Sequence, residues 1–219
     1  MPEIIRVESD DVEHRLAQLG LEEKPMADVV RRGYIAFISC SPNDPPLFPG
    51  TSAWAHMVRG LREYLLPKEW KRSDQGNYSL VVNPDGAIAI AVATGDEATG
   101  RTDTTPTTKS TRGTRTIEAV TVNQLQLNLP FVFPPVEISP SPPEQRDKRF
   151  TWILLVYRDV NEVRCELSLP LTMTDTGHIE SWQERIILGS IPIDPDLLED
   201  IVPPLPPLPD VNVDVKRRA

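Results

Sequence analysis

The sequence predicts an α+β fold, in which an antiparallel sheet built from hairpins carries N-terminal helices packed on one face. Two readable hairpins, at 78–93 and 150–169, and helical spacing in the N-terminal third lead to this prediction. With 219 residues and 39% hydrophobic content, the chain is long enough to bury the core of a domain. We therefore expect one domain over 1–202, followed by a proline-rich extended tail with a basic end over 203–219.

Apolar side chains recur at helical spacing in three segments that precede the first hairpin. The first helix is expected over 9–20 and ends at a glycine, which suits a left-handed C-terminal cap. The second is expected over 25–33, between a first-turn proline and another glycine. The third begins at Thr51 or Ser52, and Pro67 ends it. These are the helices expected to cover one face of the sheet.

The strands are predicted from β-branched composition and from alternation. The run YIAFISC, residues 34–40, predicts a buried strand between the second and third helices. The first hairpin joins strands 78–82 and 87–93 through NPDG, whose proline and glycine favour a tight turn. In the second hairpin, the return strand 163–169 alternates apolar and polar side chains, as half-buried antiparallel strands do. A further strand is expected over 179–188.

The remaining segments are connections or are ambiguous. Residues 117–129 fit both periods, and we expect a helix or turn first and a strand toward the C-terminal end. Prolines make 41–50 and 130–149 irregular loops. An aspartate and a first-turn proline predict a short helix over 194–202.

The charge balance is acidic, with a net charge of −9 at pH 7. An acidic surface disfavours broad binding to nucleic acid or to an anionic membrane. No stretch approaches the roughly 18 apolar residues of a membrane helix, and the N-terminus lacks the pattern of a signal peptide. Cys40 and Cys165 lie in apolar runs and are interpreted as core thiols, without a disulfide framework. We expect a cytoplasmic protein with no membrane segment.

A basic stretch interrupts this acidic chain. Residues 101–116, RTDTTPTTKSTRGTRT, are expected to form a flexible threonine- and arginine-rich loop after the first hairpin. Its cations can contact an acidic partner protein or, as an alternative, the phosphates of nucleic acid. The segment has no aromatic residue for base stacking, which weakens the nucleic-acid alternative. The candidate binding residues in this loop are Arg101, Lys109, Arg112 and Arg115.

Catalytic candidates are weak. A hydrolase-type site would use Cys40 as nucleophile, His56 as base and a carboxylate such as Asp44, and it requires these groups to converge in a pocket. Neither Cys40 nor Ser41 is surrounded by the glycine pattern of a nucleophile elbow. The histidines lack the spacing of metal ligands, so no metal site and no cofactor are expected.

The tail offers a second contact. PPLPPLP, residues 203–209, favours polyproline II, which is a preformed ligand for an aromatic groove. Leu205 and Leu208 are its candidate contact residues, and they can equally cover apolar surface of their own domain. The sequence therefore indicates a non-enzymatic binding protein or accessory subunit of a larger cytoplasmic assembly, with a protein partner and an undetermined oligomeric state. The two alternatives are a nucleic-acid-contacting protein and the hydrolase-type enzyme.

Overall fold

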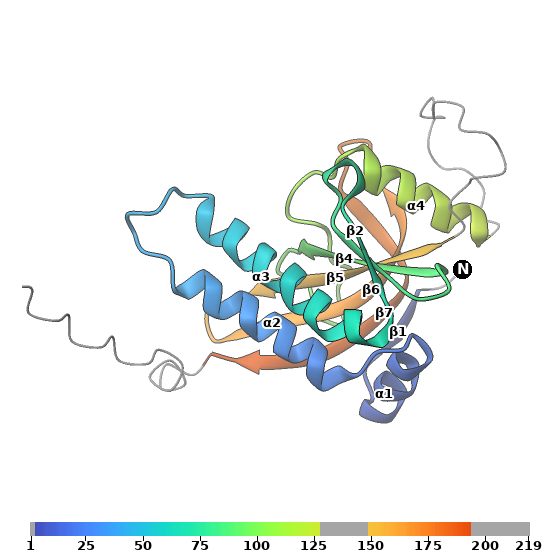
Figure 1. The fold of residues 1–219 in the computed structure, drawn as a ribbon, viewed down its shortest axis with the longest axis horizontal. Helices are drawn as coiled ribbons and strands as arrows, with labels where there is room; N and C mark the ends of the chain where they lie inside the picture. The colour runs from blue at the N-terminus through green and yellow to red at the C-terminus, as the bar shows by residue number, and fades with distance from the viewer. Residues whose placement is uncertain (1–2, 128–148, 194–219) are drawn as a thin grey trace, which may run out of the picture.

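The structure is a computed structural model that describes residues 3–127 and 149–193. Seven strands in these residues form one sheet, in the order β1-β7-β6-β5-β4-β3-β2 (Figure 1). The strands are β1 (Ile4–Arg6), β2 (Lys71–Ser73), β3 (Leu80–Val82), β4 (Ile88–Thr94), β5 (Phe150–Arg158), β6 (Glu162–Met173) and β7 (Ile179–Pro192).

The α+β class is confirmed, but the expectation of a purely antiparallel sheet is wrong. Both predicted hairpins are present, because β3 pairs antiparallel with β4 and β5 pairs antiparallel with β6. Two further pairs, β4 with β5 and β1 with β7, are parallel. Parallel neighbours need a crossover connection, and the chain between β4 and β5 makes one. The sheet is therefore mixed.

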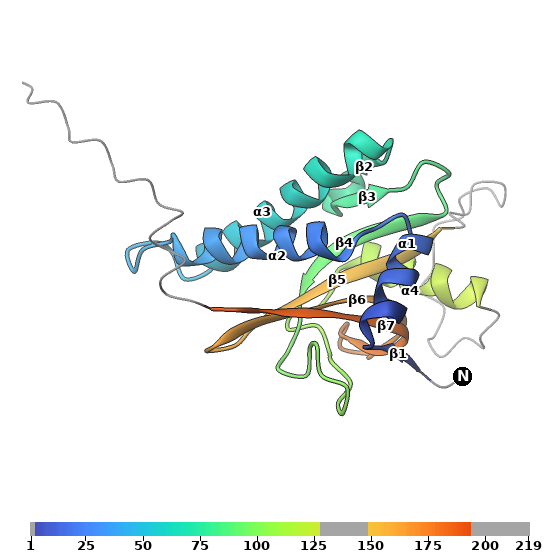
Figure 2. The same ribbon diagram turned by 90° about the horizontal axis from the view of Figure 1, so that it is seen from below.

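Four α-helices accompany the sheet in the described residues: α1 (Ser9–Gln18), α2 (Glu23–Ile38), α3 (Phe48–Leu65) and α4 (Thr114–Gln126). Buried side chains of α1, α2 and α3 form one core cluster with one face of the sheet. Val120 of α4 belongs to a second cluster, with Ile153, Met173 and Trp182 of the strands. In Figure 2, α2 and α3 lie on one side of the sheet, and the loop that follows β4 lies on the other.

The strand predicted over 34–40 is wrong, because residues 34–38 complete α2 and residues 39–40 follow its end. The helix does not stop at Gly33, which lies where α2 crosses α3. A Cβ atom at Gly33 would come within 2.4 Å of the Met57 Cγ, so glycine permits the close approach of the two helices. Local β-propensity is thus overridden by tertiary packing.

Two other boundaries also differ from the expectation. Helix α3 begins at Phe48, within the segment expected to be irregular, and has a proline in its first turn. Helix α4 continues through Gln126, so the ambiguous segment is helical over 117–126, and Leu127 caps the helix. The predicted loop 130–149 lies almost wholly outside the described residues, and the helix 194–202 and the tail 203–219 lie entirely outside them. Within the described residues, no helix is both long and apolar enough to cross a membrane.

Candidate functional site

Residues 95–113 connect β4 to α4 and lie against the polar side chains of β6 and β7. In β6 the buried side chains of Cys165 and Leu167 belong to the core cluster under α1, α2 and α3. Because side chains alternate along a strand, those of Arg164, Glu166 and Ser168 point to the opposite face. This alternation is the pattern that predicted a half-buried strand, but here the polar side is covered by the loop.

At the centre of the covered face, Glu166 and Arg185 form a wholly buried ion pair. Both side chains have 0% exposure. The Arg185 Nη2 donates to Glu166 Oε2 at 2.6 Å, and Nε donates to Oε1 at 3.0 Å, a bidentate arrangement. The Ser168 hydroxyl adds a hydrogen bond to Oε1 at 2.8 Å. The carboxylate is thus paired and hydrogen-bonded, as a buried charge must be.

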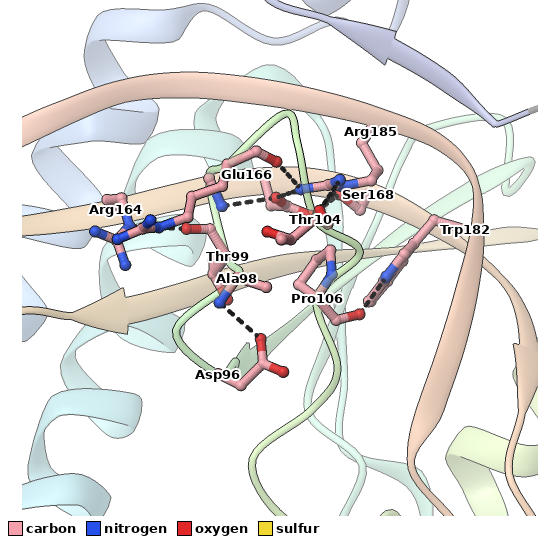
Figure 3. A network of polar contacts seen from close by, with 12 residues as sticks. Asp96, Ala98, Thr99, Thr104, Pro106, Arg164, Glu166, Ser168, Trp182 and Arg185 are labelled. Atoms are coloured by element: carbon pink, nitrogen blue, oxygen red, sulfur yellow. Dashed lines mark hydrogen bonds and ion pairs between the residues drawn. The ribbon is translucent and has the colours of Figure 1, made fainter.

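The same two side chains hold the backbone of the loop (Figure 3). The Gly100 amide donates to Glu166 Oε2 at 2.9 Å. From Arg185, Nη2 donates to the Arg101 carbonyl at 2.8 Å and Nη1 donates to the Thr104 carbonyl at 3.0 Å. These contacts fix the loop through main-chain atoms.

Arg164 and Trp182 hold the loop on either side of this pair. The Arg164 guanidinium donates to the carbonyls of Glu97, at 2.8 Å, and of Thr99, at 3.0 Å. The Trp182 indole donates to the Pro106 carbonyl at 2.8 Å (Figure 3). Three side chains of β6 and β7 thus bind carbonyl oxygens from residue 97 to residue 106.

The loop also closes on itself. The Asp96 carboxylate accepts bonds from the amide, at 3.1 Å, and from the hydroxyl, at 3.0 Å, of Thr107. The Asp96 amide in turn donates to the Thr107 carbonyl at 3.1 Å. Asp96 and Thr107 therefore bind each other and hold together the two ends of residues 97–106.

Between these anchors, residues 101–105 are exposed. We call this stretch, Arg-Thr-Asp-Thr-Thr, the exposed segment. Its backbone is held at two carbonyls by Arg185, and its side chains face solvent. Such a segment is preorganised, which lowers the entropy lost when a partner binds.

The four cations predicted to bind a partner have different surroundings. Arg101 belongs to the exposed segment, and Lys109 is also exposed. Arg112 is half-buried beside Tyr78, and burial lowers its pKa below the usual value. Arg115 lies in α4 and pairs with Glu118 at 2.9 Å. Two of the four, Arg101 and Lys109, are therefore exposed and without an ion pair in the described residues.

Cys40, Asp44 and His56 do line one hollow, of about 410 Å³, beside α2 and α3. Each of the three side chains, however, forms a hydrogen bond with the backbone. The Cys40 thiol donates to the Ala36 carbonyl at 3.3 Å, and Asp44 Oδ2 accepts from the Ser41 amide at 2.7 Å. The His56 Nδ1 lies 2.9 Å from the Ser52 carbonyl.

A nucleophile is activated by a base within hydrogen-bond reach. Among the described residues, no hydrogen bond joins the side chains of Cys40, Asp44 and His56 to one another. The same part of the chain contains no group of three His, Cys, Asp or Glu side chains able to hold a metal ion.

Sequence reasoning missed the residues that anchor the loop. Glu166, Arg185 and Trp182 lie in segments that were expected to be strands, and none of the three was named as a candidate site residue. The available signal was the presence of ionisable side chains in strands that are otherwise apolar. Leu205 and Leu208 lie outside the described residues, so their predicted role stays a prediction.

Comparison with known proteins gives no relative. No protein-family model matches the chain, and neither the curated proteins nor the solved structures contain a significant match.

Proposed function

We propose that this protein works by binding a partner protein through the exposed segment 101–105, as a non-enzymatic or accessory subunit of a larger cytoplasmic assembly. The supporting observation is the buried Glu166–Arg185 pair. Besides binding each other, the two side chains form hydrogen bonds with the backbone of this loop. A buried ion pair contributes little net stability compared with apolar residues of similar volume. Its use here is to fix the backbone of the exposed segment 101–105, whose side chains face solvent.

Two further features support a protein as the partner. The exposed segment contains both a cation and an anion, Arg101 and Asp103, together with three threonines. This mixed, hydroxyl-rich chemistry suits a polar protein surface, whereas tracking a phosphate backbone needs several cations together. We propose the tail 203–219, with Leu205 and Leu208, as a second contact.

The experiment is affinity purification from the native host of the wild type and of the Arg101→Glu/Asp103→Lys double variant. This variant keeps the net charge, and it preserves the anchoring because Arg185 binds only carbonyl oxygens there. The matched control reverses an exposed ion pair of α2 with the variant Asp28→Lys/Arg31→Glu. We expect the exposed-segment variant to lose the partner and the control to retain it. Equal recovery by both variants would overturn the proposal.

The purified wild-type protein also serves to test the nucleic-acid and the hydrolase alternatives. If nuclease treatment removes every partner of the wild type, the nucleic-acid alternative replaces the proposal. The second candidate, a hydrolase-type site, is favoured only by the hollow that Cys40, Asp44 and His56 share. It requires that Cys40→Ser abolish a hydrolytic activity which the wild type shows toward activated esters.

A further inference from the structure

Helix α3 carries an unusual share of exposed apolar side chains. Eight large hydrophobic residues are exposed in the described part of the chain, and four of them belong to α3 or directly flank it. Phe48 and Leu66 are 18 residues apart, which is five turns of an α-helix, so they lie on the same side. Single exposed hydrophobics are ordinary, but a group on one helix indicates an interaction surface.

Part of this group lines a hollow beside the edge of the sheet. The hollow has a volume of about 580 Å³, and its apolar lining includes Trp54, Val58 and Leu66. Trp54 and Val58 are four residues apart, the spacing of neighbours on one side of a helix. Trp54 has 37% exposure and Leu66 has 41%. The hollow is therefore open to an apolar side chain of a ligand.

The rim of the hollow is positively charged. Arg59, Arg62 and Arg72 line it, against the single carboxylate of Glu63. Arg59 pairs with Glu63 at 2.7 Å and Arg62 pairs with Asp74 at 2.6 Å. Arg72 forms no ion pair within the described residues. The rim is thus positively charged although the whole chain has a net charge of −9. Charged patches of this kind favour partners of opposite charge.

We infer that this hollow binds an acidic segment of a partner protein, anchored by an apolar side chain packed against Trp54 and Leu66. The apolar lining accounts for the anchor, and the three arginines account for the acidic flanks. When the segment binds, its carboxylates replace Glu63 and Asp74 as the ion-pair partners of Arg59 and Arg62. Arg72, which has no ion pair in the described part of the chain, then forms one. The inference rests on the proposed binding function, and it adds a second surface and the chemistry of the segment that occupies it.

The tryptophans provide a direct probe of the charge at this surface. The chain has four tryptophans, and Trp70, Trp152 and Trp182 are buried, so Trp54 is the one accessible to a quencher. We expect the ratio of iodide to caesium quenching to exceed that of a free, uncharged tryptophan amide, because the arginine rim concentrates anions. Trp54→Phe should remove the quenchable component. A ratio equal to or below that of the free amide would contradict the cationic rim.

Binding is tested with a short tryptophan-free peptide of alternating Glu and Leu, and with a matched Lys and Leu peptide. The acidic peptide should protect Trp54 from acrylamide saturably, and added salt should weaken this protection. Arg72→Glu and Leu66→Asp should each raise the dissociation constant about tenfold or more. Val160→Asp is the matched control, because Val160 is 83% exposed in the turn between β5 and β6. Its affinity should equal that of the wild type.

Absence of protection by the acidic peptide, or equal protection by both peptides, would overturn the inference. This failure is distinguishable from failure of the proposed function. If the peptide does not bind but the wild type captures its partner through the exposed segment 101–105, only the second surface is wrong. If the peptide does not bind and the wild type captures no protein partner at all, the binding function itself is wrong.

Discussion

Arg185 and Glu166 form a bidentate ion pair with no solvent exposure, and both also bind the backbone of residues 100–104. The pair therefore joins three parts of the fold: strand β6, strand β7 and the loop after β4. Its geometry satisfies the carboxylate and most donors of the guanidinium inside the protein. The backbone of the exposed segment 101–105 is consequently held by Arg185, a residue far away in the sequence.

Replacement of Arg185 by methionine should strongly destabilise the protein. Glu166 would become an unpaired buried carboxylate, and the carbonyls of Arg101 and Thr104 would lose their donor. We expect the free energy of unfolding in urea to fall by about 3–5 kcal/mol. Arg31→Met is the control, because Arg31 forms an exposed ion pair with Asp28 and should cost at most about 0.5 kcal/mol. Similar losses in both variants would contradict a structural role for the buried pair.

Glu184 should contribute to the acid sensitivity of the fold. Burial alone would raise the pKa of this carboxyl, but hydrogen bonds from Arg15 and Arg6 outweigh burial and leave the pKa below its usual value. The resulting stability is fully present above the unfolded pKa, near about 4.3. It is lost as the pH falls through the lower folded pKa.

The measurement compares urea unfolding at neutral and acidic pH. Wild type should lose more stability on acidification than Glu184→Gln, which has no carboxyl to protonate. Glu180→Gln, at an exposed position of the same strand, should behave as the wild type does. A Glu184→Gln variant as acid-sensitive as the wild type would show that this carboxyl contributes nothing.

The two cysteines should differ sharply in reactivity. Cys165 is wholly buried, and burial raises the pKa of its thiol to about 12, so it should be inert in the native state. Cys40 is half-buried and lines a hollow. A disulfide exchange reagent should therefore titrate one thiol in the folded protein and two in urea. Cys40→Ser should remove the native signal, and a second reactive thiol in the folded protein would contradict the burial of Cys165.

Gly33 should be the least tolerant glycine of the α2–α3 contact. Gly33→Ala would place a Cβ against Met57 and within 3.1 Å of the Ala53 carbonyl. We expect it to lower the free energy of unfolding by about 1–3 kcal/mol, as overpacking does. At Gly60 an added Cβ meets its nearest neighbour at 3.4 Å. Gly60→Ala should therefore be neutral or slightly stabilising, because alanine favours the helix. Thermal unfolding of the two variants side by side tests the difference.

The hairpins were predictable because their signals are local. NPDG specifies a turn, and the alternation of β6 specifies which side chains face the core. The structure of residues 34–40 was not predictable from local signals. Their aromatic and β-branched composition also fits a helix once Gly33 packs against Met57. Strand β1 was missed because three residues are too few to show a periodicity. The β7 residues with which they pair, 184–186, are also far away in the sequence.

The candidate site was predictable only in part. Threonine and arginine composition indicated a loop at 101–116. The loop ends at residue 113, because residues 114–116 begin α4, and composition did not indicate how the loop is held. Thr104 and Arg185 are 81 residues apart, and no local pattern links them. The convergence of Cys40, Asp44 and His56 on one hollow followed from their short separation along the chain. Their hydrogen-bond partners required the structure.

The central claim is that the protein functions by holding a protein partner. Affinity purification of the wild-type chain from its native host, with nuclease treatment and mass spectrometry, tests this claim most directly. We expect a protein partner that is recovered in constant proportion and that resists nuclease. Recovery of a monomer without any partner, or of partners that nuclease removes, would contradict it.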